Sequence, residues 1–255
     1  MQETVGQSSG EIAAAFAAGA ITKKSALAIS YQRSFLAKRC KSLLSISGAM
    51  LAVGLGEEEL RSHVSRLTAG RAVIACCNSP SSTTVSGDED AIIELERALE
   101  RSAASVRRLK VDTAYHSHHM ECVAQEYAQY TQGLHSKTPD SPVKFYSSVL
   151  GQVKTTGFGP AYWVSNLVSK IRFCDALEKL CQQLQDDSKP TSAGFCHTCV
   201  EIGPHNTLLG PIKQTLTHLR LDFFRVNCIS VLTRRRDSQL SLLQSVGSLF
   251  KIACH

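Results

Sequence analysis

Residues 6–17 read Gly-Gln-Ser-Ser-Gly-Glu-Ile-Ala-Ala-Ala-Phe-Ala. The first five fit the pattern Gly-x-Ser-x-Gly, in which a strand ends, the chain turns sharply and a helix begins. The alanine-rich run after Gly10 is typical of a helix, and Gly19 is a suitable residue to end it. The preceding strand is limited to residues 3–5. The motif alone allows two interpretations: a nucleophile elbow with Ser8 at its tip, or a surface turn rich in glycine and serine.

Composition indicates a globular protein of one or two domains, because 43% of the 255 residues are hydrophobic and 20% are charged. The 28 basic and 22 acidic residues leave a formal charge of +6, without a Lys/Arg tract like those of nucleic-acid-binding arms. No apolar run reaches the length of a membrane span. We therefore expect neither nucleic acid nor membrane as a partner. The mild positive charge favours acidic partners, such as a phosphorylated cofactor or an acidic carrier protein.

The ten cysteines have no regular spacing, and the chain shows no signal peptide. We therefore expect a cytoplasmic protein whose cysteines are reduced and partly buried. Cys196 and Cys199 have the local spacing of a zinc-binding pair, but no second pair stands at a suitable distance. His118 and His119, which follow His116, are more simply explained as exposed or locally hydrogen-bonded side chains. We predict no metal site.

Residues 46–111 alternate between strand and helix patterns. The predicted elements are a strand at 49–53, a helix at 57–67, strands at 72–77 and 83–86, a helix at 88–101 and a strand at 105–111. This order, strand-helix-strand-strand-helix-strand, is that of a ferredoxin-like unit. We therefore predict a compact subdomain over residues 46–111.

The remaining sequence, residues 1–45 and 112–255, predicts an α/β body that this subdomain interrupts. Thr22 is the predicted N-cap of a helix at 23–38. Further helices are predicted at 120–134, 161–166, 173–184, 208–217 and 239–250, and strands at 143–148, 199–202 and 230–232.

Seven blocks of sequence together resemble one family. They are residues 6–20, Tyr31-Gln32-Arg33, Cys77-Asn78-Ser79-Pro80, residues 111–120 (Val-Asp-Thr-Ala-Tyr-His-Ser-His-His-Met), residues 162–168 (Tyr-Trp-Val-Ser-Asn-Leu-Val), Glu201-Ile202-Gly203-Pro204-His205 and Ser-Val-Leu-Thr-Arg at 230–234. In this order they resemble the malonyl-CoA:acyl-carrier-protein acyltransferases, above all the acyltransferase domains of fungal, highly reducing polyketide synthases. The resemblance covers nearly the whole chain. It implies an α/β fold: an α/β-hydrolase-like acyltransferase body with an inserted ferredoxin-like subdomain.

The resemblance also implies a serine–histidine dyad. Ser8 is the expected nucleophile and His116 its base, since a free hydroxyl needs a neighbouring base to react. A backbone carbonyl at Asn166 is expected to orient the histidine. The backbone N–H of Ser9 is an expected oxyanion donor.

Three further positions carry the expected substrate contacts. The resemblance assigns Arg33 to the free carboxylate of the malonyl group, which a guanidinium binds with two parallel hydrogen bonds. Asn78 is expected to line the cleft between the subdomains. Tyr115 is bulky and is expected to exclude the extra methyl group of methylmalonyl substrates, a discrimination of about 1–3 kcal/mol.

The implied reaction loads malonyl from malonyl-CoA onto Ser8 and then onto the phosphopantetheine thiol of an acyl carrier protein. Expected partners are that carrier protein and the other domains of a polyketide synthase, and no bound cofactor is implied. Gln7 stands where the family usually has histidine, and Lys170 where it usually has proline. The family also has a segment before the elbow, with the first strands of the body and a loop carrying the second oxyanion donor, so we expect an N-terminally truncated body.

Two alternatives therefore stand beside a malonyl acyltransferase. One is a catalytically inactive fragment that binds a carrier protein or other synthase domains. The other is a stand-alone serine esterase, for which Arg33 would be dispensable.

Overall fold

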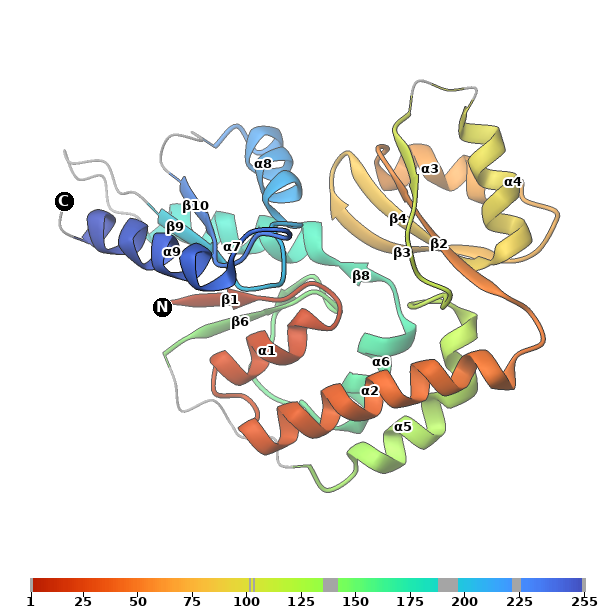
Figure 1. Ribbon diagram of the computed structural model, residues 1–255, viewed down its shortest axis with the longest axis horizontal. Coiled ribbons are helices and arrows are strands. Elements are labelled where there is room, and N and C mark those ends of the chain that lie inside the picture. The colour runs from red at the N-terminus through yellow and green to blue at the C-terminus, as the bar shows by residue number, and fades with distance from the viewer. Residues whose placement is uncertain are drawn as a thin grey trace. The chain divides into compact units, whose positions relative to one another are not determined.

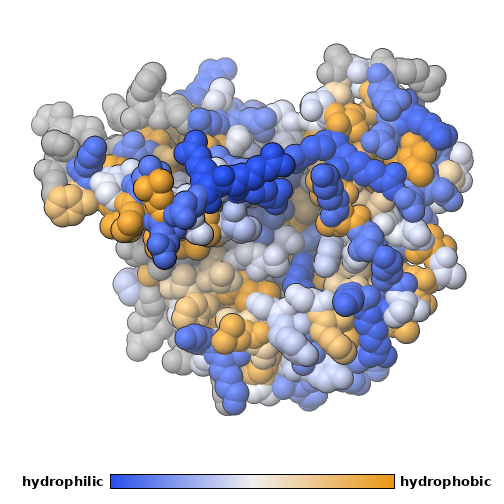
Figure 2. All heavy atoms as spheres, in the orientation of Figure 1, coloured by the Kyte–Doolittle hydropathy of each residue, from blue (hydrophilic) through white to orange (hydrophobic). Residues whose placement is uncertain are grey.

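The computed structural model describes residues 2–100, 102, 104–134, 142–187, 197–221 and 226–253. The chain divides into two compact units, residues 1–180 and 181–255. Figure 1 labels most of the helices and strands of both. None of the described helices is long and apolar enough to cross a bilayer. Hydrophilic and hydrophobic residues are interspersed over the face of the molecule shown in Figure 2.

The first unit opens with the predicted strand–turn–helix. β1 (Glu3–Val5) pairs in parallel with β6 (Lys144–Ser147), which pairs antiparallel with β7 (Gln152–Val153). The turn leads into α1 (Gly10–Ala17), and α2 (Lys23–Leu43) follows. Thr22 caps α2 as predicted, because its side chain accepts a hydrogen bond from the amide of Ser25 at 3.1 Å.

An aromatic core joins these helices to later elements of the first unit. η1 (His118–Val123, a 3₁₀ helix) and α5 (Ala124–Thr131) pack against α2, and α6 (Pro160–Val168) packs against η1 and α5; Figure 1 labels α2, α5 and α6. Tyr127, Phe145, Phe158 and Trp163 are buried there with Ile29 and Leu36 of α2. Burial of such large side chains supplies most of the stabilising free energy of a core.

The ferredoxin-like order is confirmed. The elements are β2 (Gly48–Val53), α3 (Glu57–Val64), β3 (Ala72–Ser79), β4 (Ser82–Asp88), α4 (Glu89–Glu100) and β5 (Val106–Arg108). The strands lie in the order β5-β2-β4-β3, with every neighbouring pair antiparallel. α3 and α4 contact each other and cover one face of the sheet, where Leu51, Val85, Ile92 and Leu95 are fully buried (Figure 1).

A short strand that the sequence did not predict extends this sheet. β8 (Ile171–Arg172) pairs in parallel with the edge of β3, at Cys76 and Cys77. It directly follows α6, so the backbone of the body joins the sheet of the subdomain. A two-residue strand has no periodicity of its own, and only its pairing partner identifies it.

Beyond α7 (Phe173–Asp187), the second unit contains β9 (His197–Glu201), α8 (Leu209–His218), β10 (Val226–Ser230) and α9 (Ser238–Ala253). β9 and β10 pair in parallel, with Ser230 opposite Glu201. The strand predicted at 230–232 thus begins four residues and ends two residues too far along the chain, because the pairing of β10 with β9 sets its position. Cys196, one of the two cysteines with the local spacing of a zinc-binding pair, lies outside the described residues.

Two helix predictions also need correction. The helix predicted at 120–134 begins as the 3₁₀ helix η1, because Ser117 accepts the amide of His119 at 3.2 Å and starts a tighter turn. α2 runs on past residue 38 to Leu43, since no glycine or proline ends it and Cys40 adds a buried contact in its last turn.

The two glycines of the elbow, Gly6 and Gly10, differ in how closely the chain packs against them. A Cβ at Gly6 would lie 2.3 Å from the Cα of Glu11, whereas a Cβ at Gly10 would meet nothing within 4 Å. We expect Gly6→Ala to lower the free energy of unfolding by about 1–3 kcal/mol or more, through steric overlap with backbone. Gly10→Ala should leave it unchanged or raise it by up to about 1 kcal/mol. Urea unfolding followed by circular dichroism measures both, and equal effects would contradict the close approach at Gly6.

Candidate active site

The elbow holds Ser8 in a conformation that residues with a Cβ rarely adopt. Its φ is 54°, in the left-handed region. The amides of Gly10 and Glu11 fix the turn by donating to the carbonyls of Gln7 and Ser8, at 3.0 and 3.1 Å. This hydrogen-bonded turn offsets the strain and places the hydroxyl of Ser8 at the start of α1.

His116 meets this hydroxyl from a distant part of the chain. Its Nε2 lies 2.6 Å from Oγ of Ser8. Its own φ is 61°, also left-handed, and its amide donates to the carbonyl of Leu167 at 3.3 Å. The two residues that the resemblance pairs are thus within hydrogen-bond reach, the geometry of an activated nucleophile.

The electrostatics of the site keep His116 neutral. Burial, together with the nearby positive charge of Arg33, lowers the pKa of His116 to about 3. The backbone carbonyls of Ser169 and Asn166 oppose this shift in part. No described residue meets its Nδ1 atom at hydrogen-bonding geometry. A neutral imidazole can accept the proton of Ser8 at Nε2.

Arg33 lies on α2 and reaches the same point. Its side chain is 4% exposed, and its NH2 group donates to Oγ of Ser8 at 3.2 Å. Its NH1 group donates to Oδ1 of Asn166 at 3.0 Å, and its guanidinium lies 5.8 Å from the ring of Tyr115. Burial lowers the pKa of Arg33. Among the described residues no carboxylate forms an ion pair with it, so a buried cation stands beside the hydroxyl.

Asn166 connects three parts of the site. Its Nδ2 donates to the carbonyl of Ser8 at 3.1 Å and to Glu11 at 2.7 Å, while its Oδ1 accepts from Arg33. The carbonyl of Asn166, expected to orient His116, accepts from NH1 of Arg33 at 3.4 Å. Asn166 is fully buried at the end of α6, so these contacts have fixed directions.

Glu11 is the residue that sequence reasoning missed. It is fully buried, and its carboxylate accepts from the hydroxyl of Tyr162 at 2.5 Å, from the amide and hydroxyl of Ser148 at 2.9 and 3.1 Å, and from Asn166. Burial raises its pKa, and these hydrogen bonds counter the effect. The available signal was a carboxylate in a run of otherwise apolar helix residues, which is costly unless it is paired.

Asn78 and Gln7 contact each other beside the elbow. Nε2 of Gln7 donates to Oδ1 of Asn78 at 3.2 Å, and Nδ2 of Asn78 donates to Thr84 at the same distance. Gln7, the departure from the family pattern, therefore links the elbow to β3. The amide of Ser9, the expected oxyanion donor, has no acceptor among the described residues.

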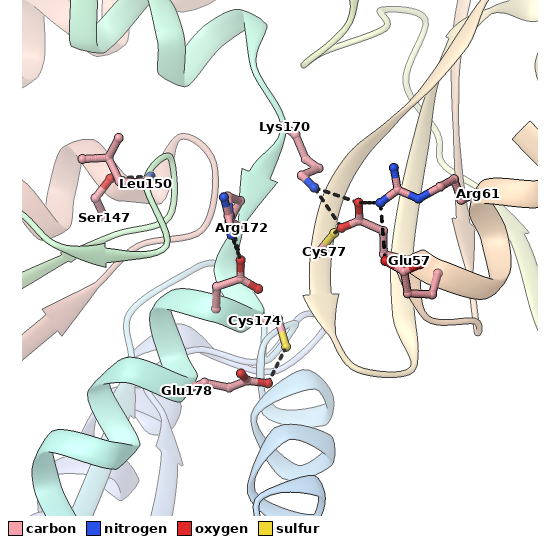
Figure 3. Close-up of polar contacts among 11 residues, drawn as sticks. Glu57, Arg61, Cys77, Ser147, Leu150, Lys170, Arg172, Cys174 and Glu178 are labelled. Atoms are coloured by element: carbon pink, nitrogen blue, oxygen red, sulfur yellow. Dashed lines mark hydrogen bonds and ion pairs between the residues drawn. The ribbon is translucent and has the colours of Figure 1, made fainter. Parts of the chain in front are cut away.

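Lys170 also has a defined partner in the subdomain. Figure 3 shows its ammonium group reaching Glu57 of α3, with Nζ 2.8 Å from each carboxylate oxygen. Arg61 and the thiol of Cys77 donate to the same carboxylate, each at 2.8 Å. Burial by itself would raise the pKa of Glu57, but the hydrogen bonds from Cys77 and Lys170 lower it. Lys170 thus ties the segment before β8 to α3.

Asp88, His118 and His119 form a second polar cluster. Oδ1 of Asp88 lies 2.9 Å from Nε2 of His118 and 2.7 Å from Nε2 of His119, and Oδ2 accepts from the amide of Arg71 at 2.7 Å. These three side chains offer possible metal ligands within 4.8 Å of one another. Hydrogen bonds to one shared carboxylate oxygen account for the arrangement, which joins the end of β4 to η1.

Comparisons with known proteins agree with this fold. The chain matches the family described as acyl transferase domain over residues 2–250. It is 45% identical over 249 residues to the highly reducing polyketide synthase ltbA of Aspergillus luteorubrus, an alignment covering 97% of this chain and 8% of that protein. It is 43% identical to the highly reducing polyketide synthase sdnO of Sordaria araneosa, covering 96% of this chain and again 8% of the relative. The chain therefore spans less than a tenth of these relatives.

Solved structures show the same architecture. The acyltransferase domain from the second module of the salinomycin polyketide synthase superposes with a TM-score of 0.79 at 28% identity, covering 98% of this chain and 53% of that one. A malonyl CoA-acyl carrier protein transacylase from Clostridium perfringens has the same fold, with a TM-score of 0.76 at 18% identity, covering 98% and 73% of the two chains. Because the family model matches residues 2–250 of this chain, the chain belongs to the acyl transferase domain family, in the form found in fungal highly reducing polyketide synthases.

Proposed function

We propose that this acyl transferase domain takes malonyl from malonyl-CoA and transfers it to the phosphopantetheine thiol of an acyl carrier protein. One observation carries the proposal: the hydroxyl of Ser8 lies 2.6 Å from His116 and 3.2 Å from the buried guanidinium of Arg33, which has no carboxylate partner among the described residues. The dyad supplies acyl transfer, and the unpaired cation supplies selectivity for an acyl group that ends in a carboxylate.

The first half-reaction uses His116 as base and then as acid. As Oγ of Ser8 attacks the thioester carbonyl, Nε2 of His116 takes the hydroxyl proton. The amide of Ser9 donates to the resulting oxyanion. When the intermediate collapses, the C–S bond breaks, His116 returns the proton to the departing sulfur, and the malonyl group remains on Ser8 as an ester.

Arg33 holds the other end of the malonyl group. Without substrate, NH2 of Arg33 donates to the hydroxyl of Ser8 and NH1 donates to Asn166. A bound malonyl carboxylate would replace the hydrogen bond to the neutral hydroxyl by an ion pair with the guanidinium, which is the stronger interaction. Tyr115 lies over the guanidinium and beside His116, with its ring centroid 6.5 Å from the imidazole. Its bulk favours malonyl over methylmalonyl by about 1–3 kcal/mol.

The second half-reaction reverses the roles. The phosphopantetheine thiol gives its proton to His116 as it attacks the ester carbonyl, and Ser8 leaves with that proton. Because the chain aligns with a small part of large synthases, we infer that the carrier protein and the other synthase domains are its partners. No step requires a bound cofactor.

We expect malonyl-CoA to leave a malonyl adduct on Ser8, because the dyad and the carboxylate site converge there. Intact-protein mass spectrometry of the folded chain measures the adduct, with Ser8→Ala as the control. A folded chain that acquires no adduct would instead favour the inactive, carrier-binding alternative.

Substitution of Arg33 separates an acyltransferase for dicarboxylates from a simple esterase. Arg33→Gln should reduce the rate of malonyl loading by about 10–100-fold, because a charge-assisted hydrogen bond to the carboxylate is lost. The rate of loading from acetyl-CoA, which has no such carboxylate, should fall much less. Quenched-flow mass spectrometry with the two thioesters measures this ratio. Equal losses with both substrates would show that Arg33 does not recognise the carboxylate.

The pH dependence of acylation reports the state of His116. Because only the neutral imidazole accepts the proton and its pKa is lowered to about 3, we expect the single-turnover rate to stay nearly constant from pH 8 down to pH 5. A histidine with an ordinary pKa near 6.5 would lose more than nine-tenths of the rate over this range. Circular dichroism at each pH controls for unfolding.

A further inference from the structure

Two thiols outside the candidate site lie within nonbonded contact distance. Cys40 belongs to the last turn of α2 and Cys122 to η1, and their Sγ atoms are 2.8 Å apart. Two carbon atoms reach their best nonbonded separation at about 3.5–4.0 Å, and sulfur is the larger atom. The sulfur atoms of a disulfide are about 2.05 Å apart. The two thiols therefore need to approach by less than an ångström to bond.

Regular elements hold both thiols in place. Each donates to the backbone carbonyl of His119, Cys40 at 2.8 Å and Cys122 at 3.1 Å. Cys40 is 1% exposed, whereas Cys122 is exposed. α2 and η1 pack directly against each other, so the pairing does not depend on a loop.

We propose that Cys40 and Cys122 form an intramolecular disulfide when the protein meets hydrogen peroxide. The sulfur of Cys122 attacks one peroxide oxygen, the O–O bond breaks, and a sulfenic acid and one water form. The sulfur of Cys40 then attacks that of Cys122, the S–O bond breaks, and the departing hydroxide takes the thiol proton of Cys40 to form a second water. The two thiols lose two electrons and two protons, and the peroxide is reduced to water.

The surroundings set this order of events. Cys122 is the thiol that solvent can reach, so it meets the oxidant first. Burial and the neighbouring thiol raise the pKa of Cys40 to about 12, which keeps it protonated and unreactive toward free oxidant. Cys40 therefore acts as the resolving thiol, held beside the oxidised sulfur.

The cross-link would join two of the segments that form the candidate site. Cys40 follows Arg33 by seven residues on α2, and Cys122 follows His116 by six. The loop that it closes, residues 40–122, contains β2 through β5 with both helices of the ferredoxin-like unit. Closing so long a loop restricts the unfolded chain more than the folded one, so the oxidised protein should be the more stable form.

Peptide mapping tests the proposal directly. After treatment of the folded chain with peroxide, alkylation without reduction and trypsin digestion, the peptide of residues 111–137 should be linked to the dipeptide Cys40-Lys41. The urea midpoint of the oxidised protein should exceed that of the same sample after dithiothreitol. Both signals should vanish in Cys122→Ser, an exposed substitution that should not disturb folding.

Cys228→Ser is the matched control. Like Cys122, Cys228 lies beside another cysteine, because it stands directly opposite Cys199 in the β9–β10 pair, but it is distant in sequence from Cys40 and Cys122. It should retain the linked peptide and the shift of the urea midpoint. Three results would overturn the proposal. Cys40 could still be alkylated when the peroxide-treated protein is unfolded for digestion, or Cys122 could be oxidised to sulfinic acid while Cys40 remains a free thiol. The third is a disulfide that joins other cysteines.

Discussion

The buried amide of Asn166 is the interaction on which the site depends. Its oxygen accepts from Arg33, and its nitrogen donates to the carbonyl of Ser8 and to the carboxylate of Glu11. Since the two ends of an amide have opposite hydrogen-bonding character, only one orientation satisfies all three contacts. That orientation fixes the guanidinium at the hydroxyl of Ser8. A buried network with every member paired is rigid, because any displacement leaves a polar group unsatisfied.

The buried carboxylate of Glu11 holds the amide of Asn166 in this orientation. Four donors converge on its carboxylate, from Tyr162, Ser148 and Asn166, and together they compensate for its complete burial. The backbone contributes strain of a different kind, because Ser8 in the elbow and the distant His116 both hold positive φ angles. Gly6 permits the close passage of the chain against Glu11 that makes the turn possible. Reactive groups are thus held by packing and hydrogen bonds rather than by their own conformational preference.

Several polar contacts join the ferredoxin-like unit to the segments that carry the site. Lys170 binds Glu57, and Gln7 binds Asn78. The strand pair β3–β8 continues the sheet into the segment after α6. Gln7 and Lys170 are the two positions where the sequence departs from the family pattern, and each has a partner in the subdomain. Both side chains are thus accommodated by polar contacts with the subdomain.

The sequence by itself determined the local elements and the family. Thr22 marked the start of α2, and alternating apolar patterns marked the strands and helices of the ferredoxin-like unit, because local periodicity follows from one-sided burial. Ser8, Arg33, His116 and Asn166 were identified by resemblance, yet no spacing shows that groups up to 158 residues apart meet around one residue, Ser8. The role of Glu11, the strand β8 and the contact of Cys40 with Cys122 were decided by tertiary structure alone. Each depends on a partner far away in the chain, and only the folded packing brings the partners together.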